Sequence, residues 1–344
     1  MTLRLNLALQ GGGAHGAFTW GVLDRLLDDD EIEIAAISGT SAGALNGAAL
    51  KAGWLADGRR GAKENLDWLW AQVGAVGDVR LSAWMLPFQP FAAAIGEAME
   101  AAFPVSPQGI AAQIFSPYGY GPYWGNPLER VAKRFHYDRI RAATGPQLFI
   151  SATNVRSGKI RVFSGKEIST EVILASACLP TVFRAVDIAD AATGTVETYW
   201  DGGYTGNPAL FPLYAPELPD DIVIVNINPL RREEVPTTAL DIQNRINEIS
   251  FNASLFGELR AIQFVKKLIA DGKVARGSMK DVHIHMIADD PLMTELSAAT
   301  KLVPTPYLLY RLKEAGRLAA DAFLTSHRAK IGKGHSVDLA AMIK

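Results

Sequence analysis

A short apolar run, followed at once by a glycine-flanked turn and an alanine-rich segment, constrains this fold more than any other feature. Residues 34–37 read Ile-Ala-Ala-Ile, and residues 44–52 are rich in alanine. The first pattern is typical of a buried strand and the second of a helix. Between them stands Gly39-Thr40-Ser41-Ala42-Gly43, which fits the G-x-S-x-G pattern of a nucleophile elbow. The sequence therefore predicts that Ser41 stands exposed at a strand-to-helix turn, near the positive end of the helix dipole, and acts as a nucleophile.

A glycine-rich turn near the start of the chain lies in a similar setting. Residues 5–9 favour a strand, and the apolar spacing from residue 18 to residue 27 predicts a helix. Between them, Gly11, Gly12 and Gly13 offer unencumbered backbone N–H groups at the start of that helix. N–H groups in this position bind anions. We therefore expect the three glycines to form an oxyanion hole.

The same turn also matches the dinucleotide-binding fingerprint G-x-G-x-x-G, through Gly11, Gly13 and Gly16. A Rossmann unit carries an acidic residue at the far end of its second strand, where it binds the ribose. Glu31 and Glu33 lie at the near end of that strand, and the elbow occupies the far end. A nucleotide-binding protein is therefore kept as an alternative from another functional class.

Later segments alternate between strand and helix patterns, which indicates an α/β protein. The expected strands cover residues 148–152, 160–163, 195–200, 222–227 and 282–287, and the expected helices cover residues 59–73, 127–135, 169–178, 242–265 and 307–323. No repeat or clean linker interrupts this order. One domain is the economical interpretation.

Residues 74–125 have weak periodicity and are dense in aromatic residues and proline. Long irregular connections in compact domains are often lids or binding loops. We interpret the segment as a helical, aromatic-rich cap that shapes an apolar substrate pocket; the alternative is a helical subdomain that buries its own aromatic side chains. The expected catalytic domain then covers residues 5–230, and residues 231–344 form a mainly helical extension packed on the same domain.

A serine hydroxyl needs a positioned base to act as a nucleophile at neutral pH. None of the six histidines stands in a loop just after a late strand. Asp201 does follow a predicted strand directly, and Gly202 and Gly203 come after it. We expect Asp201 at the carboxyl edge of the sheet, where ligands bind in open α/β sheets. The alternative is an α/β-hydrolase type of Ser-Asp-His triad in which His283 or His285 is the base.

Together these motifs resemble the patatin-like phospholipases over about residues 5–230. The motifs in order are the loop from Gly11 to Gly16, the elbow from Gly39 to Gly43, the run from Ala175 to Phe183, and Asp201-Gly202-Gly203. The resemblance implies a three-layer α/β/α fold around a central, mostly parallel sheet. It also implies an esterase in which Ser41 attacks a lipid-like ester, Asp201 accepts its proton, and the N–H groups of Gly11 to Gly13 bind the oxyanion. Water would then release the acyl group from Ser41.

One position departs from the family, which commonly has arginine or lysine where this chain has His15. A fixed cation pairs well with a phosphate, whereas an unperturbed histidine is mostly neutral at pH 7. His15 is thus a candidate substrate contact, and lipid monoesters or short polyester oligomers stand beside phospholipids as candidate substrates. A catalytically silent lipid-binding protein of the same fold is a further alternative.

Composition narrows the choice of partners. The net charge of −2 over 344 residues gives no general attraction to nucleic acid or to an anionic membrane. The single cysteine, Cys178, excludes an internal disulfide framework. The first residues lack a signal-peptide pattern, and nothing approaches the ~20 apolar residues of a membrane-spanning helix. We expect a cytoplasmic protein without a metal or cofactor, in transient contact with a membrane surface at most. The sequence does not indicate an oligomeric state.

Overall fold

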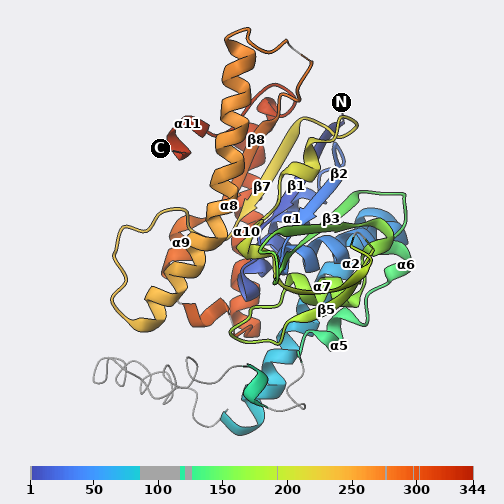
Figure 1. Ribbon diagram of the computed structural model, residues 1–344, viewed down its shortest axis with the longest axis vertical. Coiled ribbons are helices and arrows are strands. Elements are labelled where there is room, and N and C mark those ends of the chain that lie inside the picture. Colours follow the sequence, from blue (N-terminus) through green and yellow to red (C-terminus); the bar gives the residue numbers. More distant parts are fainter. Residues whose placement is uncertain are drawn as a thin grey trace.

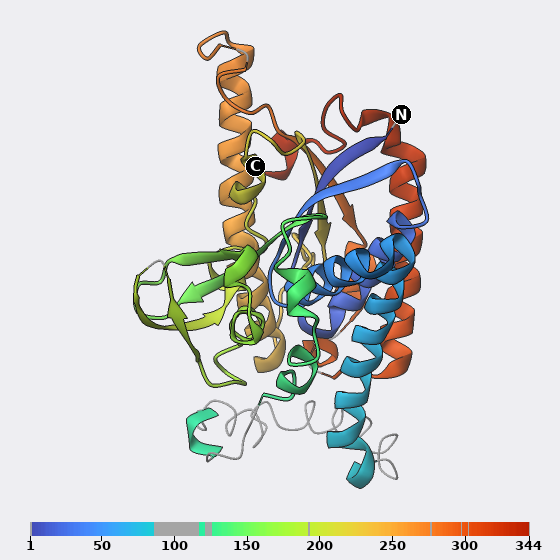
Figure 2. The same cartoon turned by 90° about the vertical axis from the view of Figure 1, so that its right-hand side faces the viewer.

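The computed structural model describes residues 2–85, 117–120, 126–191, 193–275, 277–296, 298–301 and 303–343. An eight-stranded mixed sheet runs through this part of the chain with helices on both faces (Figures 1 and 2). The strands are β1 (Leu3–Leu9), β2 (Ile32–Gly39), β3 (Gln147–Asn154), β4 (Ile160–Ser164), β5 (Val186–Asp190), β6 (Thr195–Asp201), β7 (Asp221–Asn226) and β8 (His283–Ala288). Their order is β5-β6-β3-β2-β1-β7-β8, and β4 pairs with β3.

The sheet has a parallel core and an antiparallel edge. The strands β3, β2, β1, β7 and β8 are parallel to their neighbours within this set. In contrast, β4 and β6 are antiparallel to β3, and β5 is antiparallel to β6. The carboxyl ends of the five parallel strands therefore share one edge of the sheet.

Alternating side chains of the central strands feed two apolar cores, one on each face of the sheet. The helices are α1 (Gly16–Leu26), α2 (Ala42–Met85), α5 (Glu129–Ala132), α6 (Tyr137–Ile140), α7 (Thr170–Ser176), α8 (Ala239–Ala270), α9 (Asp290–Glu295), α10 (Pro306–His327) and α11 (Leu339–Met342). In β1, Leu5, Leu7 and Leu9 pack with helices α1, α2 and α10, whereas Ala8 packs with α8. This period-2 distribution gives the expected three layers.

The C-terminal part of the chain belongs to the same core as the N-terminal part. Strand β8 extends the central sheet beside β7. Helix α10 packs so closely on α1 that a Cβ on Gly21 would lie 1.8 Å from the Lys313 carbonyl oxygen. A Cβ on Gly316 would lie 2.0 Å from the Phe18 carbonyl oxygen. Side chains at these two glycines would force the helices apart.

The structure confirms all the predicted strands and corrects several details. Strand β5 was not predicted, because only alternate residues of it are buried and it lacks a continuous apolar run. The predicted helix over residues 59–73 is the second part of α2, after a break at Asp57 and Gly58 where Gly58 has a φ of 53°. The helix expected over residues 127–135 is only the short α5.

The predicted cap falls largely outside the described residues. Residues 74–85 continue α2, and residues 117–120 form a short 3₁₀ helix. Residues 86–116 and 121–125 are not described, so the cap and its acyl-chain pocket stay predictions. Within the described chain, no helix combines the length and apolar character that crossing a bilayer requires.

Candidate active site

The register of the sheet brings the three sequence motifs to the same level. Leu9 of β1 pairs with Gly39 of β2, and Gly39 pairs with Ile150 of β3. Asp201 of β6 pairs with Ala152, two residues further along β3. Two residues beyond the paired Leu9 and Gly39, the chain reaches the glycine turn and the elbow serine. The motifs therefore meet although they are far apart in the sequence.

The elbow has the strained geometry that the G-x-S-x-G pattern predicts. Ser41 has a φ of 55°. Among the described residues, no other residue apart from glycines has a positive φ. A Cβ on Gly39 would lie 2.6 Å from the Gly43 carbonyl oxygen, and a Cβ on Gly43 would lie 2.1 Å from that of Leu9. Both flanking positions thus require glycine. Ser41 is more enclosed than expected, with 7% of its surface exposed.

Two further serines, whose roles the sequence did not reveal, hold the elbow in place. The Ser41 N–H donates to Ser176 Oγ at 2.9 Å, and Ser176 is the last residue of α7. The Thr40 hydroxyl lies 2.5 Å from Ser151 Oγ and 2.6 Å from the Gly206 carbonyl oxygen. Ser176 falls in the run that resembles the family, whereas nothing in the sequence singles out Ser151.

Asp201 lies at the end of an antiparallel strand, a strand direction that the sequence did not predict. Its strand, β6, is antiparallel to β3, so the last residue of β6, Asp201, pairs with Ala152 inside the sheet and does not lie beyond the carboxyl ends of the strands. The Asp201 side chain is fully buried. Burial raises the pKa of Asp201 to about 7, while the Gly203 N–H and the Ser41 hydroxyl act in the opposite direction. The Gly203 N–H donates to Asp201 Oδ1 at 2.8 Å. In the described chain, Oδ2 accepts no well-aligned hydrogen bond, although the Ser41 hydroxyl is near enough to lower the pKa of the carboxyl group. One carboxylate oxygen therefore remains available for a proton.

The two glycines after Asp201 allow close approach of neighbouring elements. A Cβ on Gly202 would lie 2.2 Å from the Ser151 carbonyl oxygen. A Cβ on Gly203 would lie 2.9 Å from the Phe251 ring of α8. This crowding explains why the turn at Asp201 is Asp-Gly-Gly.

Among the described residues, two N–H groups of the glycine turn are free of hydrogen bonds, where the sequence predicted three donors. The Gly11 N–H already donates to Asn207 Oδ1 at 2.6 Å, so it is not free for an oxyanion. The N–H groups of Gly12 and Gly13 donate no hydrogen bond within the described residues. Gly13 has a φ of 59°, and a Cβ on Gly16 would lie 2.5 Å from Ala42 Cβ. The glycines thus place the start of α1 against the start of α2.

A set of buried amide side chains holds this turn, and sequence patterns did not identify them. Gln10 Oε1 accepts from the N–H groups of Ile227 and Asn228, at 2.9 Å and 3.1 Å. Asn228 Nδ2 donates to the Gly11 carbonyl oxygen at 2.7 Å. Gln10 Nε2 donates to Asn252 Oδ1 of α8 at 3.2 Å. The turn is thereby tied to both the end of β7 and α8.

His15, the expected substrate contact, is a buried structural residue in this arrangement. Its side chain is not exposed, and its Nε2 lies 2.7 Å from Thr300 Oγ1. Burial, together with the charge of Lys301, lowers the pKa of His15 to about 3. The ring is therefore neutral at pH 7 and contacts protein atoms, so it supplies no cation for a phosphate.

The histidines proposed for a triad lie on β8, the edge strand of the sheet, which is three strands away from the elbow strand β2. His285 and His283 pair with Val223 and Asp221, near the amino end of β7, and β7 and β1 separate β8 from β2. Three strand spacings amount to about 14 Å. His285 Nε2 lies 2.8 Å from Asp221 Oδ1, which accounts for this buried histidine without a catalytic role.

The nucleotide-binding alternative lacks its acidic residue at the far end of β2. Glu33 lies near the amino end of that strand, where it pairs with Arg4. Glu31 precedes the strand and pairs with Arg328. The far end carries Ser41, as described above. Within the described residues, no cluster of three or more His, Cys, Asp or Glu side chains could hold a metal ion.

A comparison with protein families is in line with this geometry. The model of the patatin-like phospholipase family matches residues 7–214, a range that contains the glycine turn, the elbow and Asp201. No curated protein matches the chain. Among solved structures, VipD from Legionella pneumophila is similar, with 15% sequence identity and a TM-score of 0.43. The match covers 94% of this chain and 67% of the VipD chain.

Proposed function

We propose that Ser41 and Asp201 form the catalytic dyad of this chain, which belongs to the patatin-like phospholipase family. The members of this family are hydrolases that act on lipid ester bonds. One observation carries the proposal: Asp201 is fully buried, level with Ser41, and keeps one carboxylate oxygen that accepts no well-aligned hydrogen bond from the described residues. A carboxyl group with a pKa of about 7 is well suited to exchange protons at neutral pH.

The chemistry follows from these positions. Ser41 Oγ attacks the ester carbonyl carbon, and its proton passes to Asp201 Oδ2. The N–H groups of Gly12 and Gly13 stabilise the oxyanion that develops on the carbonyl oxygen. The carbon–oxygen bond to the leaving alcohol then breaks, and Asp201 returns the proton to that alcohol. An acyl group remains on Ser41. A water molecule then attacks it and gives a proton to Asp201, the bond between the acyl carbon and Ser41 Oγ breaks, and Asp201 returns the proton to Ser41 Oγ.

The substrate class is a lipid-like carboxylic ester. The neutral, buried His15 gives no support to recognition of a phosphate at that position. Lipid monoesters and other uncharged acyl esters are therefore at least as good candidates as phospholipids. The test is hydrolysis of phospholipids, monoacylglycerols and p-nitrophenyl esters of graded chain length, with Ser41→Ala as the control. Turnover that is absent throughout the series, or that persists in Ser41→Ala, would contradict the proposal.

We expect the pH profile to report Asp201. The base must be ionised, and burial raises its pKa to about 7. The kcat/KM for a short soluble ester should therefore fall about tenfold for each pH unit below 7 and level off above it. Initial rates from about pH 5 to pH 9 measure this. A profile that is already flat above about pH 5 would show that an unperturbed carboxylate, or no carboxylate, is the base.

A further inference from the structure

One face of α8 carries an exposed apolar stripe, which we define as Ile242, Ile246, Ile249, Ala253 and Phe256. The first three side chains are 42%, 53% and 55% exposed, Ala253 is exposed, and Phe256 is partly buried. The spacing of four, three, four and three residues places all five on one side of the helix. The opposite side, with Leu255 and Leu259, lies in the core. A continuous apolar face that the described residues leave exposed marks an interaction surface.

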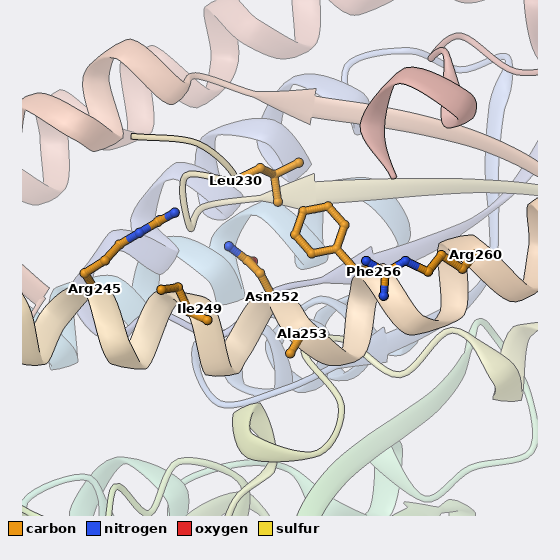
Figure 3. A pocket seen from close by; sticks show the side chains of 7 residues that line it. All are labelled: Leu230, Arg245, Ile249, Asn252, Ala253, Phe256 and Arg260. Carbon is orange, nitrogen blue, oxygen red and sulfur yellow. The ribbon is translucent and has the colours of Figure 1, made fainter. Parts of the chain in front are cut away.

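The stripe borders a shallow pocket of about 250 Å³ with cationic ends (Figure 3). Its lining comprises Leu230, Arg245, Ile249, Asn252, Ala253, Phe256 and Arg260. Figure 3 shows the two arginines at opposite ends of the row, with Ile249, Asn252 and Phe256 between them. The lining contains no acidic residue, and Arg260 is exposed without an ion pair in the described part of the chain.

Positive charge is also in excess behind this pocket. The fully buried Glu248 carboxylate contacts Arg232, Arg245 and Lys301, so three cations surround one anion. Burial acts to raise the pKa of Glu248, but Arg232 and Lys301 lower it to about 2, so the carboxylate stays ionised at neutral pH. The three basic side chains thus outnumber the one carboxylate that they contact, while the charge of Asp241 also acts on Arg232 and burial lowers the pKa of Lys301.

The stripe and the pocket adjoin the catalytic edge of the sheet. Leu230 follows β7 in the same short segment as Asn228, whose side chain binds the glycine turn. Asn252 lines the pocket and bonds to Gln10, directly before that turn. Phe251, next to it on α8, lies against Gly203 beside the proposed base. Phe251 lies on the buried side of α8, so the helix itself stands between a ligand held on the stripe and the active-site edge.

We infer that this face of α8 docks the protein on an anionic lipid surface, with the apolar stripe entering the interface and the two arginines contacting head groups. The spacing favours a surface over a single small anion. Arg245 and Arg260 are fifteen residues apart on one helix, which corresponds to about 22 Å along its axis. Neighbouring lipids present anionic groups over such a length and apolar chains between them, as interfacial helices require.

The same charges disfavour a second copy of the chain in the register that is centred on the pocket. In a two-fold symmetric pairing of the stripe, if residue i of one copy contacts residue j of the other, then j also contacts i. Antiparallel pairing centred on Asn252 and Ala253 would bring Arg245 of one copy opposite Arg260 of the other. Two such like-charge contacts would flank the interface, and like charges across an interface oppose association. A lipid surface has the complementary charge.

The experiment is co-sedimentation with vesicles of phosphatidylcholine, either alone or mixed with anionic phosphatidylglycerol. Full-length Ser41→Ala protein is used so that the vesicles are not hydrolysed, and the result then does not depend on the proposed dyad. The protein should bind the mixed vesicles more tightly, and added salt should weaken this preference. Arg260→Gln should weaken binding to the mixed vesicles about fivefold. Ile249→Asp should weaken it about tenfold or more.

The matched control is Leu318→Asp, which changes an equally accessible apolar side chain on α10, 71% exposed. It should bind vesicles as the parent does, and circular dichroism should show that all the variants are folded. The inference is overturned if Ile249→Asp binds like the parent, if Leu318→Asp loses as much, or if neutral vesicles bind equally well. A dimer in sedimentation equilibrium that Ile249→Asp dissociates would identify a second copy as the occupant instead.

Discussion

Asp201→Asn should lower turnover of a short ester by about 10²–10⁴-fold, the range over which positioned general bases contribute. The amide has nearly the same shape as the carboxylate, so it fits the same buried space. It cannot accept the proton of Ser41 as a carboxylate does, because its oxygen is far less basic. Steady-state kinetics on a p-nitrophenyl ester measure the loss, which should appear in kcat.

The same substitution should stabilise the fold, and this separates lost chemistry from lost structure. The pKa of Asp201 is about 7 in the folded protein, against an ordinary value of 3.8. The folded state therefore holds a proton that the unfolded state releases, and wild-type stability falls as pH rises from about 4 to about 7. The uncharged amide of the Asp201→Asn variant carries no such penalty. The gain in the free energy of unfolding of this variant should thus grow over this interval and stay constant above it.

Variants of the two histidines on the edge strand β8 serve as controls for Asp201→Asn. His283→Ala and His285→Ala should keep the kcat of the wild type in the fraction of protein that folds, because β7 and β1 separate β8 from the elbow strand. Near-normal turnover in Asp201→Asn, together with none in either histidine variant, would replace the dyad by a triad. A destabilised Asp201→Asn protein would contradict the charge argument.

Gly11→Ala should reduce turnover by about 10²-fold or more, although it adds a single methyl group. The new Cβ would lie 2.5 Å from Ser41 Cβ and 2.9 Å from the Thr40 carbonyl oxygen. Neither atom is the end of a flexible side chain, so the elbow or the glycine turn must shift. A displacement of about 1 Å at a reacting group is enough for a loss of this size.

Gly257→Ala is the matched control, because nothing lies within 4 Å of a Cβ at that exposed position of α8. It should keep wild-type turnover and gain slightly in stability, since alanine favours a helix over glycine. Wild-type turnover in Gly11→Ala would show that the turn does not pack against the nucleophile as described. Unchanged turnover together with lost NAD(P) affinity would instead support the nucleotide-binding alternative.

Much of the site could be predicted from the sequence because its signals are local. A buried strand, a glycine-flanked serine and a following helix are encoded within residues 34–52, so the elbow at Ser41 was predictable. Asp201 was recognisable from its place at the end of a strand and from the two glycines that follow.

The remaining features depend on contacts between distant segments. Asn207 binds the Gly11 N–H across 196 positions of the chain, and no local pattern could show that this donor is occupied. The direction of β6 depends on its antiparallel pairing with β3, which an isolated strand pattern does not specify. His15 looked available because its environment, formed partly by Thr300 and Lys301, comes from the far end of the sequence.

The most direct test of the dyad is the rate at which a fluorophosphonate probe labels the protein, with the modified residue located by peptide mass spectrometry. We predict one adduct, on Ser41, whose formation slows markedly in Asp201→Asn and proceeds at the wild-type rate in His283→Ala. The labelling rate should also rise with pH through about 7, as the buried carboxyl group ionises. Labelling at another residue, or labelling of Ser41 at an unchanged rate in Asp201→Asn, would contradict the account.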